Sequence, residues 1–131
     1  MDEQRFKQGL EKRKAVLGGD YVEQTLANAN DFSRPFQEMM AEYCWGFGWG
    51  DETLPAKTRS MLNLTMIAAL NRMHEWELHL NGAIKNGVSK DEIQAILHHI
   101  AIYCGVPAGV ECFRIANRVF AALEDDEEQA S

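Results

Sequence analysis

Hydrophobic residues recur at helical spacing along most of the chain, and the alternation typical of β-strands is absent from the sequence. In residues 90–104 the apolar positions fall within an arc of about 140° at ~100° per residue. Residues 61–70 are apolar almost all round, interrupted only by Asn63 and Thr65, as is typical of a central helix. The pattern therefore predicts an all-α fold of six to seven helices.

Capping and breaking residues mark the ends of these helices. Ser89 and Glu92 have the spacing of a capping box, and Asp20 with Glu23 resembles a second one, opening a short helix that ends near residue 29. Further breaks are expected at Gly18-Gly19, Asn71, Gly87 and Gly105-Val106-Pro107. The last helix is predicted over residues 108–123.

The segment 45–50, Trp-Gly-Phe-Gly-Trp-Gly, interrupts the helical pattern. Three glycines that alternate with aromatic residues cannot hold a regular helix, but they can fold over an apolar surface. We therefore expect an irregular segment here, after a helix that covers about residues 34–45.

Several of the predicted helices are apolar over more than one face. A single layer of six or seven helices in 131 residues cannot bury both sides of each helix. This predicts burial between subunits, and hence a homo-oligomer.

Length and charge indicate one helical domain over residues 1–123 and an acidic tail over 124–131. The net charge is −7, but five of the acidic residues form a consecutive run at positions 124–128. Without this run the chain has 13 basic and 15 acidic residues, and its net charge is −2. Such an acidic run is typically solvated and disordered, with partner binding as the alternative. The nearly neutral body lacks the basic stripe that a nucleic-acid partner would need.

The sequence also bears on location and redox chemistry. No stretch approaches the ~18 apolar residues of a membrane-spanning helix, and the first residues lack the pattern of a secretory signal. Three cysteines are an odd number and form no CxxC motif, which disfavours a disulfide framework and a cysteine zinc site. We expect a cytoplasmic protein with reduced thiols and no membrane partner.

The richest stretch in chemical groups is residues 71–79. His74 and His79 superficially suggest a zincin motif, but they are five apart, or about 140° around a helix, and cannot converge on one metal. Arg72, Glu75 and His79 stand at i, i+3 and i+7, within about 60° of one another. A carboxylate one turn before an imidazole can orient it for acid or base work. The alternative is a surface Glu–His pair.

Two further candidates lie outside that stretch. Arg59 and Asn63, four apart at the start of the central helix, could bind a carboxylate in a dry site; the alternative for Arg59 is a salt bridge. Glu42 follows two methionines, and burial there would suit it to proton transfer; pairing with Arg59 or Arg72 is the alternative.

The chain resembles the carboxymuconolactone decarboxylase family, within the alkylhydroperoxidase-D-like fold. The resemblance covers about residues 5–122. It is carried by these segments: Arg13 to Gly18, Asp31 to Glu38, Glu42 to Gly46, Lys57 to Ser60, Glu75 to His79, Asn86 to Val88, and Ala101 to Ala108. It implies an orthogonal helical bundle, for which we expect a trimer or hexamer, and a carboxy-lyase without metal or organic cofactor. The implied reaction converts 4-carboxymuconolactone into the enol-lactone of 3-oxoadipate with loss of CO2, a step of aromatic compound catabolism in the β-ketoadipate pathway.

The resemblance also assigns expectations to individual residues. The peroxidase branch of this fold has a C-x-x-C-x-x-x-H helix, and Arg72 and Glu75 stand where its cysteines would be, so a thiol peroxidase is excluded. For the lyase we expect catalytic roles for His79, oriented by Glu75, and for Glu42, as a second acid or an arginine partner. We expect the remaining candidates to bind the substrate: Arg59 and Arg72 as carboxylate anchors, Trp45 and Trp49 as an apolar wall, and Asn63 as a further binding residue.

One departure from the family pattern concerns the substrate. Asp51 stands where decarboxylases of the family usually have a basic residue, which would repel a dianion near that loop. The chain could then act on a less charged molecule, or the loop lies away from the site. Two alternatives to the lyase stay open: a cofactor-free isomerase, and a non-catalytic helical oligomer that binds partners through its acidic tail.

Overall fold

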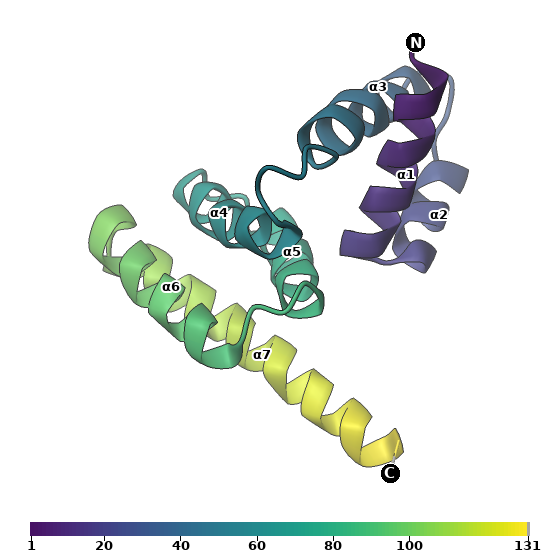
Figure 1. Cartoon of the computed structure of the whole chain (residues 1–131). Coiled ribbons are helices and arrows are strands. Elements are labelled where there is room, and N and C mark those ends of the chain that lie inside the picture. Colours follow the sequence, from purple (N-terminus) through teal and green to yellow (C-terminus); the bar gives the residue numbers. More distant parts are fainter. Residues whose placement is uncertain (131) are drawn as a thin grey trace. The chain divides into compact units, whose positions relative to one another are not determined.

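The computed structural model describes residues 1–130, and all of their regular structure is helical (Figure 1). Seven α-helices and one π-helix follow one another: α1 (Glu3–Leu17), α2 (Gly19–Ala27), α3 (Arg34–Met39), η1 (Met40–Gly48), α4 (Ala56–Ala69), α5 (Met73–Lys85), α6 (Lys90–Cys104) and α7 (Val106–Ala130). None of these helices is long and apolar enough to cross a membrane. The all-α class is thus confirmed for the part of the chain that the structure describes.

The chain divides into two compact units, Met1–Arg59 and the part that begins at Ser60. The first unit holds α1, α2, α3, η1 and the first turn of α4, and the second holds the rest of α4 with α5, α6 and α7. No linker marks this boundary in the sequence, because it falls inside a continuous helix.

In the first unit α1 packs directly against the π-helix η1. Two glycines allow the close approach: a Cβ built on Gly9 would lie 1.8 Å from the backbone oxygen of Ala41, and one on Gly46 would lie 2.5 Å from the backbone oxygen of Arg5. The backbones therefore meet where any larger residue would collide with main-chain atoms. The core of this unit is formed around Val16, Trp45 and Trp49.

The π-helix is a difference from the sequence prediction. Residues 45–50 were expected to be irregular after an ordinary helix, but α3 passes into η1 at Met40, and the wide turns continue to Gly48. At its end the amide of Trp49 donates to the carbonyl of Cys44 at 3.0 Å, the i→i+5 bond of such a turn. The alternating glycines thus occur in a widened helix that supports the close contact with α1.

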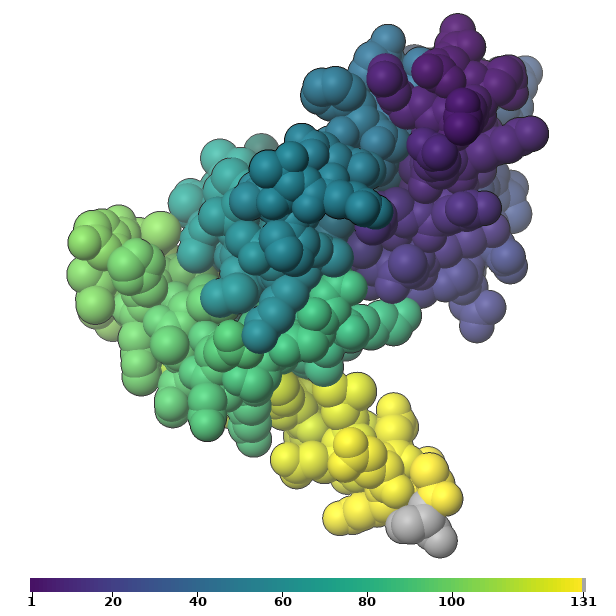
Figure 2. Space-filling view, viewed as in Figure 1, coloured from purple at the N-terminus to yellow at the C-terminus, as the bar shows by residue number. Residues whose placement is uncertain are grey.

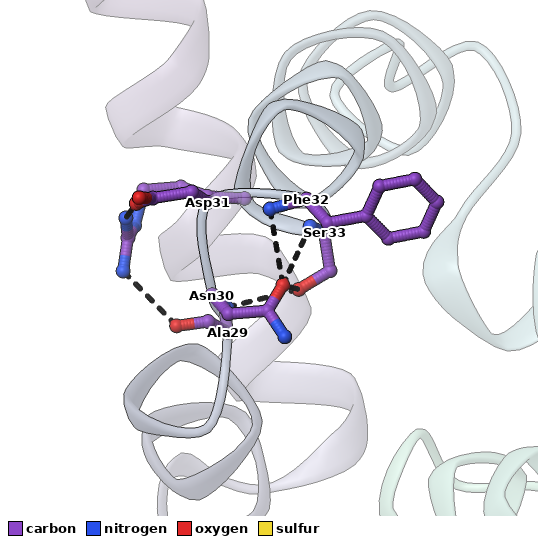
Figure 3. A network of polar contacts seen from close by, with 6 residues as sticks. Ala29, Asn30, Asp31, Phe32 and Ser33 are labelled. Atoms are coloured by element: carbon purple, nitrogen blue, oxygen red, sulfur yellow. Dashed lines mark hydrogen bonds and ion pairs between the residues drawn. The ribbon is translucent and has the colours of Figure 1, made fainter.

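The connection from α2 to α3 is fixed by Asn30 (Figure 3). Its side-chain oxygen accepts hydrogen bonds from the amides of Phe32 at 3.1 Å and Ser33 at 3.0 Å, while the Arg34 guanidinium donates to the backbone oxygen of Ala29 at 3.0 Å. The Phe32 ring points outward and is 95% exposed. Asn30 therefore organises the turn that precedes α3.

The predicted capping box at Asp20 and Glu23 is wrong. Helix α2 begins at Gly19, its N-cap is Gly18, and no side chain caps it. Gly18 has φ 100°, which ends α1 and at once starts α2 two residues earlier than an Asp20 cap would allow.

In the second unit α6 and α7 lie side by side and antiparallel (Figure 1). The predicted capping box of α6 is confirmed, with Ser89 and Glu92 bonded reciprocally. The predicted breaks are also confirmed, since the backbone is left-handed at Asn71 (φ 57°), Gly87 (φ 92°) and Gly105 (φ 103°). The core of the unit gathers apolar side chains from all four helices, among them Leu64, Trp76, Leu80, Ile93, Leu97, Ile100, Cys112 and Ile115.

The last helix extends further than predicted. The sequence predicts its end at residue 123 and a disordered acidic tail after it, whereas α7 continues to Ala130 and includes the acidic run. Its last turns stand clear of the rest of the second unit (Figure 2, yellow). Glutamate and alanine favour helix even without packing, and the acidic side chains of 124–128 are exposed to solvent.

Candidate functional site

Helix α5 carries two of the three side chains that were predicted to converge. Glu75 and His79 lie one turn apart in it, so the predicted register between them holds. Arg72 lies outside the helix: it is the N-cap residue, with φ −100° and ψ 72°, directly after the left-handed Asn71. Helical periodicity therefore does not place the Arg72 guanidinium beside the other two. Arg72 and Glu75 are exposed, so the three groups do not share a water-poor hollow within one chain.

The imidazole of His79 is the half-buried member of the group. Burial lowers the pKa of His79 below its ordinary value, because the charged ring loses water, and the negative charge of Glu75 raises the pKa by a smaller amount. The neutral imidazole is therefore the favoured form at neutral pH. In this form the ring has one donor and one acceptor nitrogen and can take part in proton transfer.

The amide of Asn63 reaches this imidazole from α4. Its Nδ2 lies 3.5 Å from Nδ1 of His79, and both side chains are partly buried. The sequence predicts substrate binding for Asn63 and orientation of the imidazole for Glu75. The structure adds a polar contact between Asn63 and His79, which are 16 positions apart in the sequence.

Two hydrogen bonds link α4 to α5 and to its C-cap residue on either side of this contact. The indole Nε1 of Trp76 donates to the backbone oxygen of Leu64 at 2.9 Å, and the amide Nδ2 of Asn86 donates to the hydroxyl of Ser60 at 3.0 Å. Trp76, Leu64 and Ser60 are fully buried. These positioning residues could not be predicted from spacing within one helix, because each bond joins residues of two separate elements.

Glu42 lies in the first unit and is buried, 7% exposed, as the sequence suggested. Its carboxylate accepts a hydrogen bond from the backbone amide of Asp2 at 2.9 Å. The arginine partner that the sequence analysis considered is not found in the part of this unit that the structure describes. Glu42 instead ties the start of the chain to η1.

Trp45 and Trp49 are core residues of the first unit. Their rings stack with centroids 5.0 Å apart and 25° between their planes, and only 3% and 7% of the two residues is exposed. They pack with Val16 and leave little area for a ligand. Their main role in this unit is to fill the space beside α1.

Arg59, the last residue of the first unit, is half-buried and engaged with the loop before α4. Its Nη2 donates to the backbone oxygen of Asp51 at 2.8 Å. Hydrogen bonds from Thr53, followed by the charge of Arg59, hold the pKa of the Asp51 carboxyl below its usual range. The backbone oxygen of Asp51 is therefore a local hydrogen-bond partner of Arg59.

The thiols are free in the described residues: Cys44 and Cys104 are exposed and Cys112 is buried. Burial raises the pKa of Cys112 to about 12, so this thiol stays protonated. Its behaviour is that of a small apolar core residue.

Comparison with known proteins identifies the group to which this chain is related. Residues 34–118 match the sequence profile of the Carboxymuconolactone decarboxylase family. The chain is 41% identical over 122 residues to a 4-carboxymuconolactone decarboxylase from Acinetobacter baylyi, covering 93% of this chain and 91% of that protein. It is 40% identical over 120 residues to a nitrosuccinic acid decarboxylase from Metarhizium robertsii, covering 92% and 84%.

A shorter match has the same name as the first relative. A 4-carboxymuconolactone decarboxylase from Pseudomonas putida is 45% identical over 47 residues, 35% of this chain and 98% of that sequence. The profile matches more than half of the chain, and the two longer relatives are aligned over nearly all of it. The chain belongs to the carboxymuconolactone decarboxylase family.

Proposed function

We propose that this protein is a cofactor-free carboxy-lyase for a small carboxylic acid, with 4-carboxymuconolactone as the first candidate substrate. The observation that carries the proposal is the half-buried His79, whose pKa is lowered by burial and whose ring contacts Asn63. A neutral imidazole in such surroundings can stabilise developing negative charge on oxygen and deliver a proton. The similarity to two proteins named as decarboxylases supports the same reaction class.

The substrate itself supplies the electron sink. When the carboxylate leaves as CO2, the electrons of the broken C–C bond move through the ring double bond onto the lactone carbonyl and form an enolate. A proton then adds to carbon and gives the enol-lactone, so that no external oxidant or reductant is needed. Nitrosuccinic acid has a comparable acceptor in its nitro group, whose oxygens take up the electron pair in the same manner.

The protein must hold the acid and stabilise the oxyanion. We assign oxyanion stabilisation or proton donation to His79, with Glu75 one turn away contributing its charge. Arg72, exposed at the start of α5, is proposed as a carboxylate anchor. The roles expected for Arg59, Glu42, Trp45 and Trp49 stay predictions, since each of these residues is engaged within the first unit.

A substrate assay tests the reaction class. We expect purified protein to release CO2 from 4-carboxymuconolactone or nitrosuccinic acid, with a change in the absorbance of the lactone. An absorbance change without CO2 would replace the lyase by an isomerase. No change with either acid would contradict the proposal and favour a binding protein, whose partner association should then depend on residues 124–131.

We further infer that the protein forms a homo-oligomer, a trimer or a hexamer. Large apolar side chains are exposed in both units, such as Phe32 (95%), Phe47 (65%), Ile102 (74%) and Tyr103 (76%). Exposed apolar residues in such numbers are typical of surfaces that are covered in an assembly. Sedimentation velocity is expected to give a mass near three or six times 14.8 kDa, and a stable monomer would contradict this inference.

A further inference from the structure

We propose that Asn63 is a positioning residue that holds His79 in the neutral tautomer with its proton on Nε2. The inference deepens the proposed function, because it specifies which ring nitrogen can donate to an oxyanion. Only the catalytic consequence of the inference rests on the proposed function. The contact between the amide and the ring stands on the structure of the second unit alone.

The first step is the chemistry of the contact. Nδ2 of Asn63 faces Nδ1 of His79 at 3.5 Å, and an amide nitrogen can only donate. Nδ1 must therefore present its lone pair in this arrangement. A neutral imidazole has one donor and one acceptor, so the proton is then on Nε2. With the opposite amide orientation, Oδ1 would accept from Nδ1–H, and the tautomer would be reversed.

The second step is the rigidity of the frame. Three polar contacts join α4 to α5 and its C-cap residue in opposite chain order: Ser60 to Asn86, Asn63 to His79, and the carbonyl of Leu64 to Trp76. Trp76 is fully buried, and both it and Asn86 bond at 3.0 Å or less. Asn63 precedes Leu64 directly, so the backbone that carries the amide is fixed by the Trp76 bond. Such support holds a side chain near a productive geometry.

The third step is the charge state of the ring. Burial lowers the pKa of His79 more than the charge of Glu75 raises it, and the neighbour from α4 is an uncharged amide. In the neutral ring only one nitrogen is protonated, so the choice of tautomer decides which nitrogen donates. An imidazolium would donate from both nitrogens. The Nε2–H donor then suits an enolate or nitronate oxygen, which needs a hydrogen bond as charge develops.

Nitrogen NMR of the histidine ring tests the tautomer without reference to activity. With full-length protein at pH about 8, where an ordinary imidazole is neutral, we expect the His79 signals to show a protonated Nε2 and an unprotonated Nδ1. In Asn63→Asp, whose carboxylate can only accept, we expect the proton to move to Nδ1. Asn81→Ala removes an exposed amide from α5 and should leave the His79 signals unchanged.

Kinetics of the same variants show the catalytic consequence. We expect kcat of Asn63→Asp and Asn63→Leu to fall about 10- to 100-fold, a part of what a positioned proton-transfer group contributes, with a smaller change in KM. The Asn81→Ala control should keep its activity, and circular dichroism should show that all variants are folded.

The outcomes separate this inference from the proposed function. A protonated Nδ1 in the natural protein, or an unchanged tautomer in Asn63→Asp, would overturn the inference even if the protein is an active decarboxylase. An Nε2 proton that moves to Nδ1 in Asn63→Asp, in a protein inactive on both acids, would uphold the tautomer and contradict the lyase.

Discussion

Replacing His79 with alanine is expected to lower kcat/KM for decarboxylation by about 100- to 10,000-fold, the usual contribution of a positioned proton-transfer group. The imidazole is half-buried, is favoured in its neutral form and touches Asn63, so its loss removes the group best placed to meet an oxyanion. The decrease should be mainly in kcat, because charge on the lactone oxygen develops only as CO2 leaves. Steady-state rates of CO2 release measure it.

His74 offers a matched control on the same helix. It lies five positions before His79 and is exposed, so His74→Ala removes an equal side chain away from the Asn63 contact. We expect its kcat/KM to stay within about twofold of the natural protein. Equal losses in the two variants, or an unaltered kcat/KM in His79→Ala, would remove His79 from the mechanism.

The helix ends show which features of the fold can be predicted from sequence. The capping box of Ser89 and Glu92 and the left-handed Asn71, Gly87 and Gly105 depend on residues within four positions of each other, so the local sequence determines them. The π-helix does not have such a local cause. It accompanies the approach of α1 to within backbone contact of Ala41, which involves residues more than 30 positions apart.

The candidate site also combines features that follow from local sequence with features that depend on tertiary packing. Glu75 and His79 share a helix, and helical spacing was sufficient to relate them. The same spacing related Arg72 to these two residues, but the break at Asn71 leaves Arg72 at the N-cap, where regular helical spacing no longer holds. Asn63 meets His79 only because α4 and α5, which are separate elements, meet in the second unit. That packing is a tertiary arrangement, and spacing along one helix cannot reveal it.

Gly9→Ala is expected to destabilise the protein by at least about 3 kcal/mol, near the upper end for overpacking. The added Cβ would lie 1.8 Å from the backbone oxygen of Ala41, and 2.8 Å from the backbone nitrogen of Gly46. Both obstacles are main-chain atoms, so no side-chain rotation can relieve the clash and α1 must separate from η1. The separation also opens the core around Val16, Trp45 and Trp49. Urea unfolding followed by tryptophan fluorescence measures the loss.

Gly19→Ala provides the comparison, because it makes the same chemical change in open space. A Cβ at Gly19 would have no atom within 4 Å, and Gly19 is the first residue of α2, where alanine has the better helix propensity by about 1 kcal/mol. The free energy of unfolding of this variant should therefore equal or exceed that of the natural protein. If Gly9→Ala were as stable as Gly19→Ala, α1 and η1 could not be in backbone contact as the structure has them, and the tight packing of the first unit would be wrong.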